Sequence, residues 1–191
     1  MLKKIENMKI KNKLKKENSK KKIKSLSQKE VEIIAWLEFY QKYFFKIKEI
    51  EQFFRDKSQR YNTFKSLLKK KRIVKLNKEK YYLIPIKART GGWAEDPFIL
   101  ADEIFNGRDY FVGGWTAANF WRLTDQIPFS IEVFTTKRQG EVNILNTKFI
   151  FHRTTHEKIK KAVIRKIAGH EFKILNKKES KKWLKSRKSL I

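Results

Sequence analysis

The chain has 191 residues, a length that accommodates one or two small domains. It contains no cysteine, which excludes disulfide bonds, thiolate nucleophiles and cysteine-rich zinc sites, and which fits a reducing compartment. The net charge of +27, from 47 Lys and Arg against 20 Asp and Glu, favours a polyanionic partner such as nucleic acid. No apolar run reaches the roughly 18 residues of a membrane span. No apolar stretch of signal-peptide type follows the basic N-terminus, so we expect a cytoplasmic protein without a membrane partner.

The positive charge is distributed unevenly along the chain. Residues 1–28 carry a net charge of +9 and residues 29–90 carry +10, whereas residues 91–152 carry −3 and residues 153–191 carry +11. Codon bias in an AT-rich genome accounts for part of the lysine but not for this distribution. An acid-leaning middle between basic flanks predicts a DNA-binding part joined to a part with another role.

The first 26 residues are interpreted as a basic, flexible tail. Met1–Lys24 is rich in lysine and has little apolar surface to bury, so it is expected to be mobile or only transiently helical. Two interpretations stay open: an arm that touches DNA phosphates, or a solvated tail.

Three helices are predicted after the tail. Ser27 caps the first helix, with Glu30 three residues on as in a capping box. A short second helix spans Lys48–Phe54, and Ser58 caps a third that runs from Gln59 to about Lys70. The apolar residues expected to face inward are Val31, Ile34, Ala35, Leu37, Phe39, Ile50, Phe53, Phe54, Tyr61, Phe64, Leu67 and Leu68.

Two short strand-like runs follow the third helix. Arg72–Leu76 and Lys80–Pro85 are joined by a polar turn at Asn77-Lys78-Glu79, which predicts a hairpin. Three helices followed by a hairpin are typical of a winged helix-turn-helix, which we place at residues 27–88.

The third helix and the hairpin carry the candidate DNA-binding residues. A helix in the major groove needs hydrogen-bonding side chains on its outer face, and wing lysines suit phosphates. On the helix, the candidates are Ser58, Gln59, Arg60, Asn62, Thr63, Lys65 and Lys69; on the hairpin, they are Lys75, Lys78 and Lys80. The alternative is an ordinary solvated helix in a lysine-rich chain.

Residues 89–191 are predicted to form a second domain after a hinge at Arg89–Gly92. Its expected helices are Phe98–Phe105, opened by Pro97, and Ala117–Leu123, capped by Thr116. Its expected strands are Asp109–Val112, Phe129–Thr135, Val142–Leu145 and Lys148–His152, and basic helices are expected at His156–Ile167 and Glu179–Ser186. The predicted fold class is therefore α+β: an N-terminal winged helix-turn-helix followed by a smaller mixed α/β domain.

A motif rich in glycine and tryptophan lies in this second domain. Tyr110–Ala118 contains Gly113-Gly114-Trp115-Thr116, and Phe120–Gln126 follows it. Further along are Val133–Thr136, Gly140 and Phe149–Phe151. These stretches resemble AbiEi-type antitoxins of bacterial toxin–antitoxin pairs, and Leu67–Pro85 is similar to the recognition helix and wing of that family. The resemblance covers roughly residues 30–152.

The resemblance implies a DNA-binding repressor of its own operon with a C-terminal antitoxin domain and a role in phage abortive infection. It implies double-stranded operator DNA as partner, with inverted repeats and a homodimer on the DNA. It also implies a nucleotidyltransferase-like toxin that is antagonised without a stable complex, as in type IV systems.

From the residues alone, the motif is interpreted as structural. Gly113 and Gly114 permit backbone angles that other residues resist, and Trp115, Phe120 and Trp121 are large enough to anchor a core. A surface role for Arg122 or Gln126 remains the alternative.

Three possible enzyme sites are weak. His152 and His156 have the spacing of metal ligands on one helix face but lack a third ligand, so no metal is expected. Glu132 near Asp109 resembles part of a nuclease site, but Phe134 stands where the catalytic lysine would be. The glycine pairs lack the spacing and lysine of a phosphate loop. We expect a non-catalytic protein with no cofactor; the alternatives are a stand-alone winged-helix transcription factor with a sensing or dimerisation domain, and a nuclease.

Overall fold

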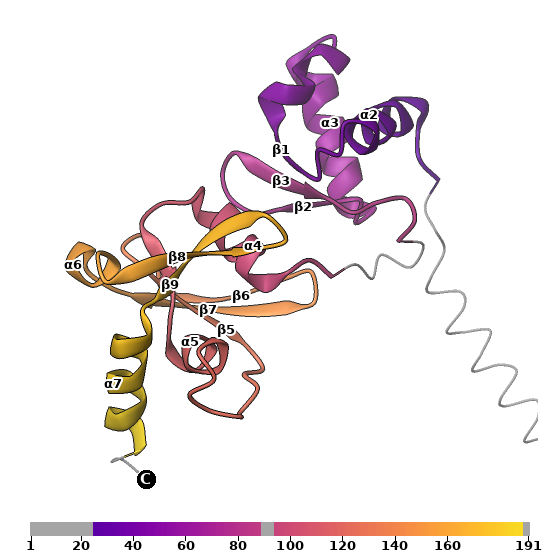
Figure 1. The fold of residues 1–191 in the computed structure, drawn as a ribbon. Helices are drawn as coiled ribbons and strands as arrows, with labels where there is room; N and C mark the ends of the chain where they lie inside the picture. Colours follow the sequence, from indigo (N-terminus) through magenta and orange to yellow (C-terminus); the bar gives the residue numbers. More distant parts are fainter. Residues whose placement is uncertain (1–24, 89–93, 189–191) are drawn as a thin grey trace, which may run out of the picture.

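The computed structural model describes residues 25–88 and 94–188. The predicted tail and the predicted hinge at Arg89–Gly92 therefore lie outside the described residues, apart from the last two positions of the tail. The fold combines helices with two sheets, so the predicted α+β class is confirmed (Figure 1). Among the described residues, no helix is both long and apolar enough to cross a membrane.

The N-terminal part alternates helices and short strands. It consists of α2 (Gln28–Phe39), β1 (Phe44–Lys46), the 3-10 helix η1 (Ile47–Phe53), α3 (Lys57–Lys69), β2 (Ile73–Lys75) and β3 (Lys80–Leu83). The three strands form an antiparallel sheet in the order β1-β3-β2. Strand β1 was not predicted, because three residues are too few to show a periodic pattern.

Helix starts in this part follow local chemistry. The Ser27 side chain accepts from the Glu30 N–H, and the Glu30 carboxylate accepts from the Ser27 N–H, so the predicted capping box is confirmed. The prediction that Ser58 caps the third helix is wrong. Asp56 is the N-cap and accepts a 2.8 Å hydrogen bond from the Gln59 N–H, so α3 begins before Ser58.

The second part is built on a six-stranded mixed sheet. Its helices are α4 (Pro97–Phe105), α5 (Gly114–Phe120), α6 (His156–Ile159) and α7 (Lys177–Lys188). Its strands are β4 (Tyr110–Val112), β5 (Ile131–Thr135), β6 (Gly140–Ile144), β7 (Thr147–Arg153), β8 (Ala162–Ile167) and β9 (His170–Leu175). The strand order is β6-β7-β5-β4-β9-β8, with β5 parallel to β7 and β4 parallel to β9. This part is the larger of the two, contrary to the prediction of a smaller second domain.

Two further predictions for the second part are wrong. The expected basic helix at His156–Ile167 is only one turn, α6, followed by the β8–β9 hairpin. Alternation of Phe172 and Ile174 toward the core, with Gly169 at φ +82° in the turn, favours strands there. Thr116 does not cap a helix: it lies inside α5, where its hydroxyl donates to the Ser130 carbonyl and accepts from the Glu132 N–H.

The small sheet, β1-β3-β2, lies between two apolar cores and contributes residues to both. On one face, Phe45, Ile73, Tyr81 and Leu83 pack against the buried residues of α2, η1 and α3, which are Ile33, Ile34, Leu37, Ile50, Phe64 and Leu67. Of the residues predicted to face inward, Val31, Ala35, Phe39, Tyr61 and Leu68 are exposed instead. Which side chains of a helix are buried depends on the elements that pack against it, and these cannot be read from the sequence of the helix itself.

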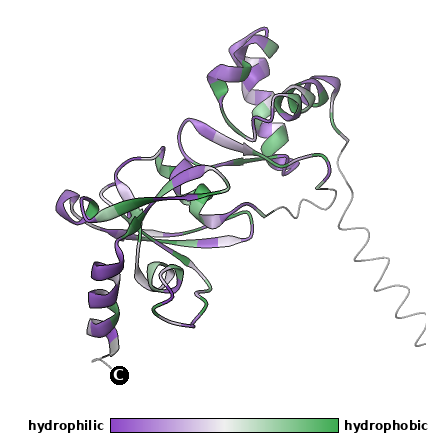
Figure 2. Ribbon diagram, in the orientation of Figure 1, coloured by the Kyte–Doolittle hydropathy of each residue, from purple (hydrophilic) through white to green (hydrophobic). Residues whose placement is uncertain are grey.

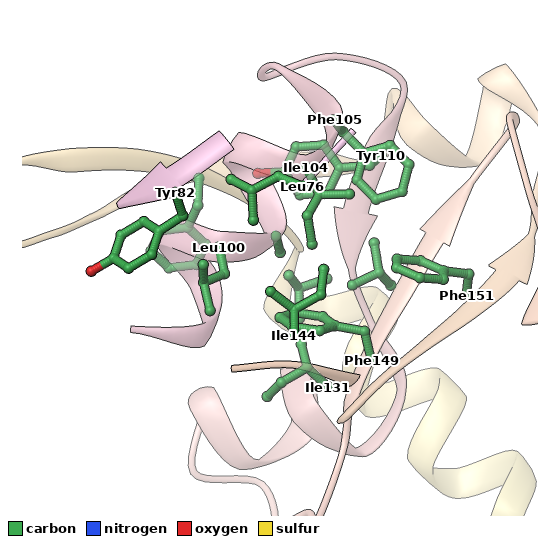
Figure 3. Packing of buried hydrophobic residues seen from close by; sticks show 14 of the residues in the cluster. Leu76, Tyr82, Leu100, Ile104, Phe105, Tyr110, Ile131, Ile144, Phe149 and Phe151 are labelled. Atoms are coloured by element: carbon green, nitrogen blue, oxygen red, sulfur yellow. The ribbon is translucent and has the colours of Figure 1, made fainter. Parts of the chain in front are cut away.

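The opposite face of the small sheet completes the core of the second part. Tyr82 and Ile84 join Leu76 in one cluster with residues of α4 and the large sheet, among them Leu100, Ile104, Tyr110, Phe149 and Phe151 (Figure 3). Many strand segments are green, whereas α7 is mostly purple (Figure 2). The two parts therefore share buried surface.

Polar contacts reinforce this junction. The side-chain amide of Asn77, at the tip of the β2–β3 hairpin, donates to the carbonyl oxygens of Glu103 and Ile104 at 3.3 and 3.0 Å. Lys80 forms an ion pair with Glu103, and the Tyr82 hydroxyl donates to Glu95 at 2.9 Å. The hairpin is thus anchored on α4.

Candidate nucleic-acid interface

Helix α3 presents a mostly polar face with three lysines to solvent. Its exposed residues are Lys57, Ser58, Tyr61, Asn62, Lys65, Leu68 and Lys69. Ser58, Asn62, Lys65 and Lys69 recur every three or four residues, so they form one stripe along the helix. No acidic side chain occurs within α3. The stripe combines hydroxyl, amide and ammonium groups, which are the groups that contact base edges and phosphates.

Three of the candidates on α3 are less accessible. Arg60 is about 30% exposed in its side chain and forms a 2.7 Å ion pair with Glu51 of η1. The Gln59 side-chain oxygen accepts from the Arg55 N–H at 2.8 Å, and Thr63 is half-buried. Arg60 could contact a base only after leaving Glu51, so Asn62 and Lys65 are better placed.

The hairpin lysines are not equivalent. Lys75 and Lys78 are exposed, whereas Lys80 is 15% exposed in its side chain and is paired with Glu103. The structure therefore brings Lys80 to the junction with α4 rather than to a free surface. Lys75 and Lys78 remain available for phosphates, but the anchored tip at Asn77 is not free to enter a groove.

Sequence reasoning missed Tyr61 and Lys57 as members of the exposed face. Tyr61 is 65% exposed, and the Lys65 ammonium lies 5.8 Å from its ring centroid. The signal was present in the spacing: Lys57, Tyr61 and Lys65 recur every four residues, which places them on one side of a helix.

Buried contacts hold α3 against α2. Phe64 and Leu67 insert into the helix-side core, and Lys70 at the C-cap pairs with the buried Glu30 of α2 at 2.6 Å. Burial alone would raise the pKa of Glu30, but hydrogen bonds from Lys70, Ser66 and the Ser27 N–H outweigh it and lower that pKa. Glu30 therefore stays ionised at neutral pH and fixes the C-terminal end of α3.

Charge also organises the N-terminal end of α3. The pKa of Asp56 is lowered, first by the hydrogen bond from the Gln59 N–H and then by the one from Arg55. An ionised carboxylate at this position also stabilises the positive end of the helix dipole. The exposed face of α3 is thus presented by a helix that is fixed at both ends.

A hollow of about 630 Å³ lies beside the junction of the two parts. Lys46, Arg108 and Lys137 line it together with Asp102. Lys137 is already paired with Asp109 at 3.1 Å, and Asp102 accepts from the Tyr110 hydroxyl at 2.7 Å. Charges of both signs face this hollow, so it does not extend the basic face of α3.

The glycine-tryptophan motif forms a compact structural joint. Gly114 begins α5 at φ +57°, and a Cβ placed there would overlap the Glu132 carboxylate. One Glu132 oxygen accepts from the Trp115 N–H at 2.8 Å, and the other lies 3.0 Å from His152 Nε2. A Cβ at Gly113 would lie 2.6 Å from the Phe134 ring. Glycine is thus required at both positions, because a neighbouring side chain leaves no room for a Cβ.

The large aromatic residues of the motif, Trp115, Phe120 and Trp121, are half-buried rather than fully buried. Phe120 and Trp121 pack against the large core, and Trp121 donates to the Leu175 carbonyl at 2.7 Å. Trp115 meets Trp183 of α7 edge to face at 5.4 Å. These residues join α5 to β9 and α7, which agrees with the structural interpretation of the motif.

The carboxylates considered for a nuclease do not come together. The strand register pairs Val112 with Val133 and Tyr110 with Thr135, so Asp109 and Glu132 lie at opposite ends of the β4–β5 ladder. Asp109 pairs with Lys137, and Glu132 is occupied by Trp115 and His152. In the described ranges, no group of three His, Cys, Asp or Glu side chains could hold a metal ion.

Comparison with known proteins adds no relative: the chain matches no family model and no curated protein.

Proposed function

We propose that the chain is a DNA-binding transcriptional regulator whose residues 27–88 form a winged helix-turn-helix, with α3 as the recognition helix. The observation that carries the proposal is the exposed stripe of α3, which lies opposite Phe64 and Leu67 in the core. The element order of helix, strand, two helices and a hairpin supports it, because it is the order of winged-helix domains.

The proposed contacts divide by chemistry. The Asn62 amide can form paired hydrogen bonds with adenine, and Lys65 can donate to guanine. Lys57, Lys69, Lys75 and Lys78 contact phosphates, because the flexible point charge of a lysine suits phosphate oxygens. We leave Lys80 out because it is paired with Glu103.

We also propose that the chain acts as the repressor and antitoxin of an AbiE-like pair and works in the cytoplasm. The placement of Gly113, Gly114 and Glu132 at one joint supports this reading, because it explains why a motif of that family would need two adjacent glycines. The experiment is co-expression with a nucleotidyltransferase-like toxin encoded beside it. Restored growth supports the antitoxin role. Toxicity that persists at equal toxin levels contradicts it.

Binding to duplex DNA is expected to weaken steeply with salt. Five to nine phosphate contacts would give a slope of log affinity on log salt of about −4 to −8, because each neutralised phosphate releases condensed counterions. The measurement is a fluorescence-anisotropy titration of a duplex at several salt concentrations. A slope near zero would contradict the electrostatic basis of the proposed interface.

A further inference from the structure

The exposed side of helix α7 is a row of positive charges. Lys177, Lys181 and Lys185 recur every four residues, which places their Cα atoms about 6 Å apart along the helix axis. Lys178, Lys182 and Arg187 are exposed as well. Like charges four residues apart destabilise a helix, so a chain that keeps them in a row gains from a partner that neutralises them.

The orientation of α7 is fixed by its other side. Ser180 and Leu184 are buried, and Trp183 packs edge to face on Trp115. At the start of the helix, the Asn176 side chain accepts from the Glu179 N–H at 2.9 Å. The row of lysines therefore cannot turn toward the protein.

Few carboxylates compensate this charge. Glu179, the single acid of α7, already pairs with Lys161 at 3.2 Å and with Lys182 at 3.3 Å. In the part of the chain that the structure describes, Lys177, Lys181 and Lys185 have no ion-pair partner.

Helix α7 lies far from α3. Figure 1 places α3 in the N-terminal part at one end of the molecule and α7 at the other, with the large sheet between them. A nucleic-acid segment on α7 is therefore a different segment from the one on α3.

We propose that α7 is a second DNA-binding surface, which binds the sugar–phosphate backbone of a DNA duplex without reading its sequence. Lysine ammonium groups suit phosphates. The exposed side of α7 carries no amide, and its one guanidinium, that of Arg187, lies 5.5 Å from the Trp183 ring centroid. A membrane partner is disfavoured, because a helix lying on a bilayer needs a free apolar face and that of α7 is covered by α5. With α3 at the other end, and resting on its proposed binding of DNA, the chain joins two duplex segments.

The first test is lysine acetylation of the full chain with and without a random-sequence duplex, read by mass spectrometry. Lys177, Lys181 and Lys185 are expected to lose reactivity with DNA, whereas exposed Lys148 in the acid-leaning part keeps its reactivity. The same protection is expected in a variant with Lys65→Glu and Lys69→Glu, because α7 binds independently of α3. Unchanged reactivity of the three α7 lysines overturns the proposal, whatever α3 does. A duplex RNA arm distinguishes the two nucleic acids: weaker protection by RNA than by DNA supports DNA as the partner, and stronger protection overturns it.

The second test is capture of a labelled duplex by a bead-bound duplex through the protein. A variant with Lys177→Glu, Lys181→Glu and Lys185→Glu should stay on the beads but lose capture. A control with the same charge change reverses Lys29, Lys148 and Lys166, which face surface carboxylates. If the parent captures the duplex, equal capture by the α7 variant overturns the proposal, as does equal loss in the control. If the parent captures none while the three α7 lysines are protected by DNA, the proposed role of α3 is contradicted instead.

Discussion

Replacing Tyr82 with alanine is expected to destabilise both parts of the molecule together, by about 3–5 kcal/mol for a buried large aromatic. Tyr82 is 1% exposed and packs with Phe44 at a ring separation of 4.9 Å. It belongs to the core that also holds Leu100 and Tyr110, and its hydroxyl donates to Glu95. A loss of this size is a large share of the 5–15 kcal/mol that stabilises a typical domain.

Hydrogen exchange measures this effect separately in each part. Amides of α2 and of β5 are expected to exchange faster by similar factors in Tyr82→Ala. The control is Tyr81→Ala, which removes the same side chain from the other face of β3, where it packs in the core beneath α2 and α3. In that variant, amide exchange should accelerate more in α2 than in β5. If β5 keeps its protection in Tyr82→Ala, the two parts fold independently and the shared core contributes little.

Gly114→Ala is expected to cost about 2–5 kcal/mol. A side chain at φ +57° carries a backbone penalty of about 1–2 kcal/mol. The added methyl group also forces the Glu132 carboxylate away, which leaves the Trp115 N–H unpaired at a cost of about 1–3 kcal/mol. Denaturant unfolding of the variant gives the total.

A second glycine separates the two contributions. Gly169→Ala also has a positive φ, +82°, but a Cβ there meets nothing within 4 Å, so it should cost only the backbone penalty of about 1–2 kcal/mol. In a double-mutant cycle, Gly114→Ala should lower the free energy of unfolding less in a Glu132→Ala background than in the parent, because the Glu132 carboxylate that it overlaps is gone. Equal costs for Gly114→Ala and Gly169→Ala would show that the approach of Glu132 is unimportant.

Local patterns predicted much of the N-terminal part. The capping box at Ser27 and Glu30, the polar hairpin turn at Asn77 and the inward positions of Phe64 and Leu67 each depend on residues a few positions apart. Such signals can be read along the chain because the interactions themselves are local.

Contacts between distant residues explain most of the errors. Strand β8 lies in the segment that the sequence predicted to be a basic helix, because its pairing with β9 cannot be read from the residues of β8 alone. Lys80 was predicted to contact DNA. Its actual partner, Glu103, lies 23 residues away, so the ion pair could not be recognised from the residues around Lys80. Tyr61 and Leu68 were placed inward although the core already holds Phe64 and Leu67. The shared core at Tyr82 could not be foreseen for the same reason.

The central claim is that the exposed stripe of α3 reads DNA sequence, and enrichment of duplexes from a random library tests it most directly. The parent protein is expected to enrich a distinct sequence. A variant with Ser58→Ala, Asn62→Ala and Lys65→Ala should still bind duplex DNA through its other lysines but lose the preference, at about 1–3 kcal/mol for each base contact removed. A variant with Lys148→Ala, remote from α3 on β7, should enrich the same sequence as the parent. Enrichment of one sequence by the parent but none by the α3 variant is the predicted result. Enrichment of the same sequence by both, or of none by the parent, would contradict the claim.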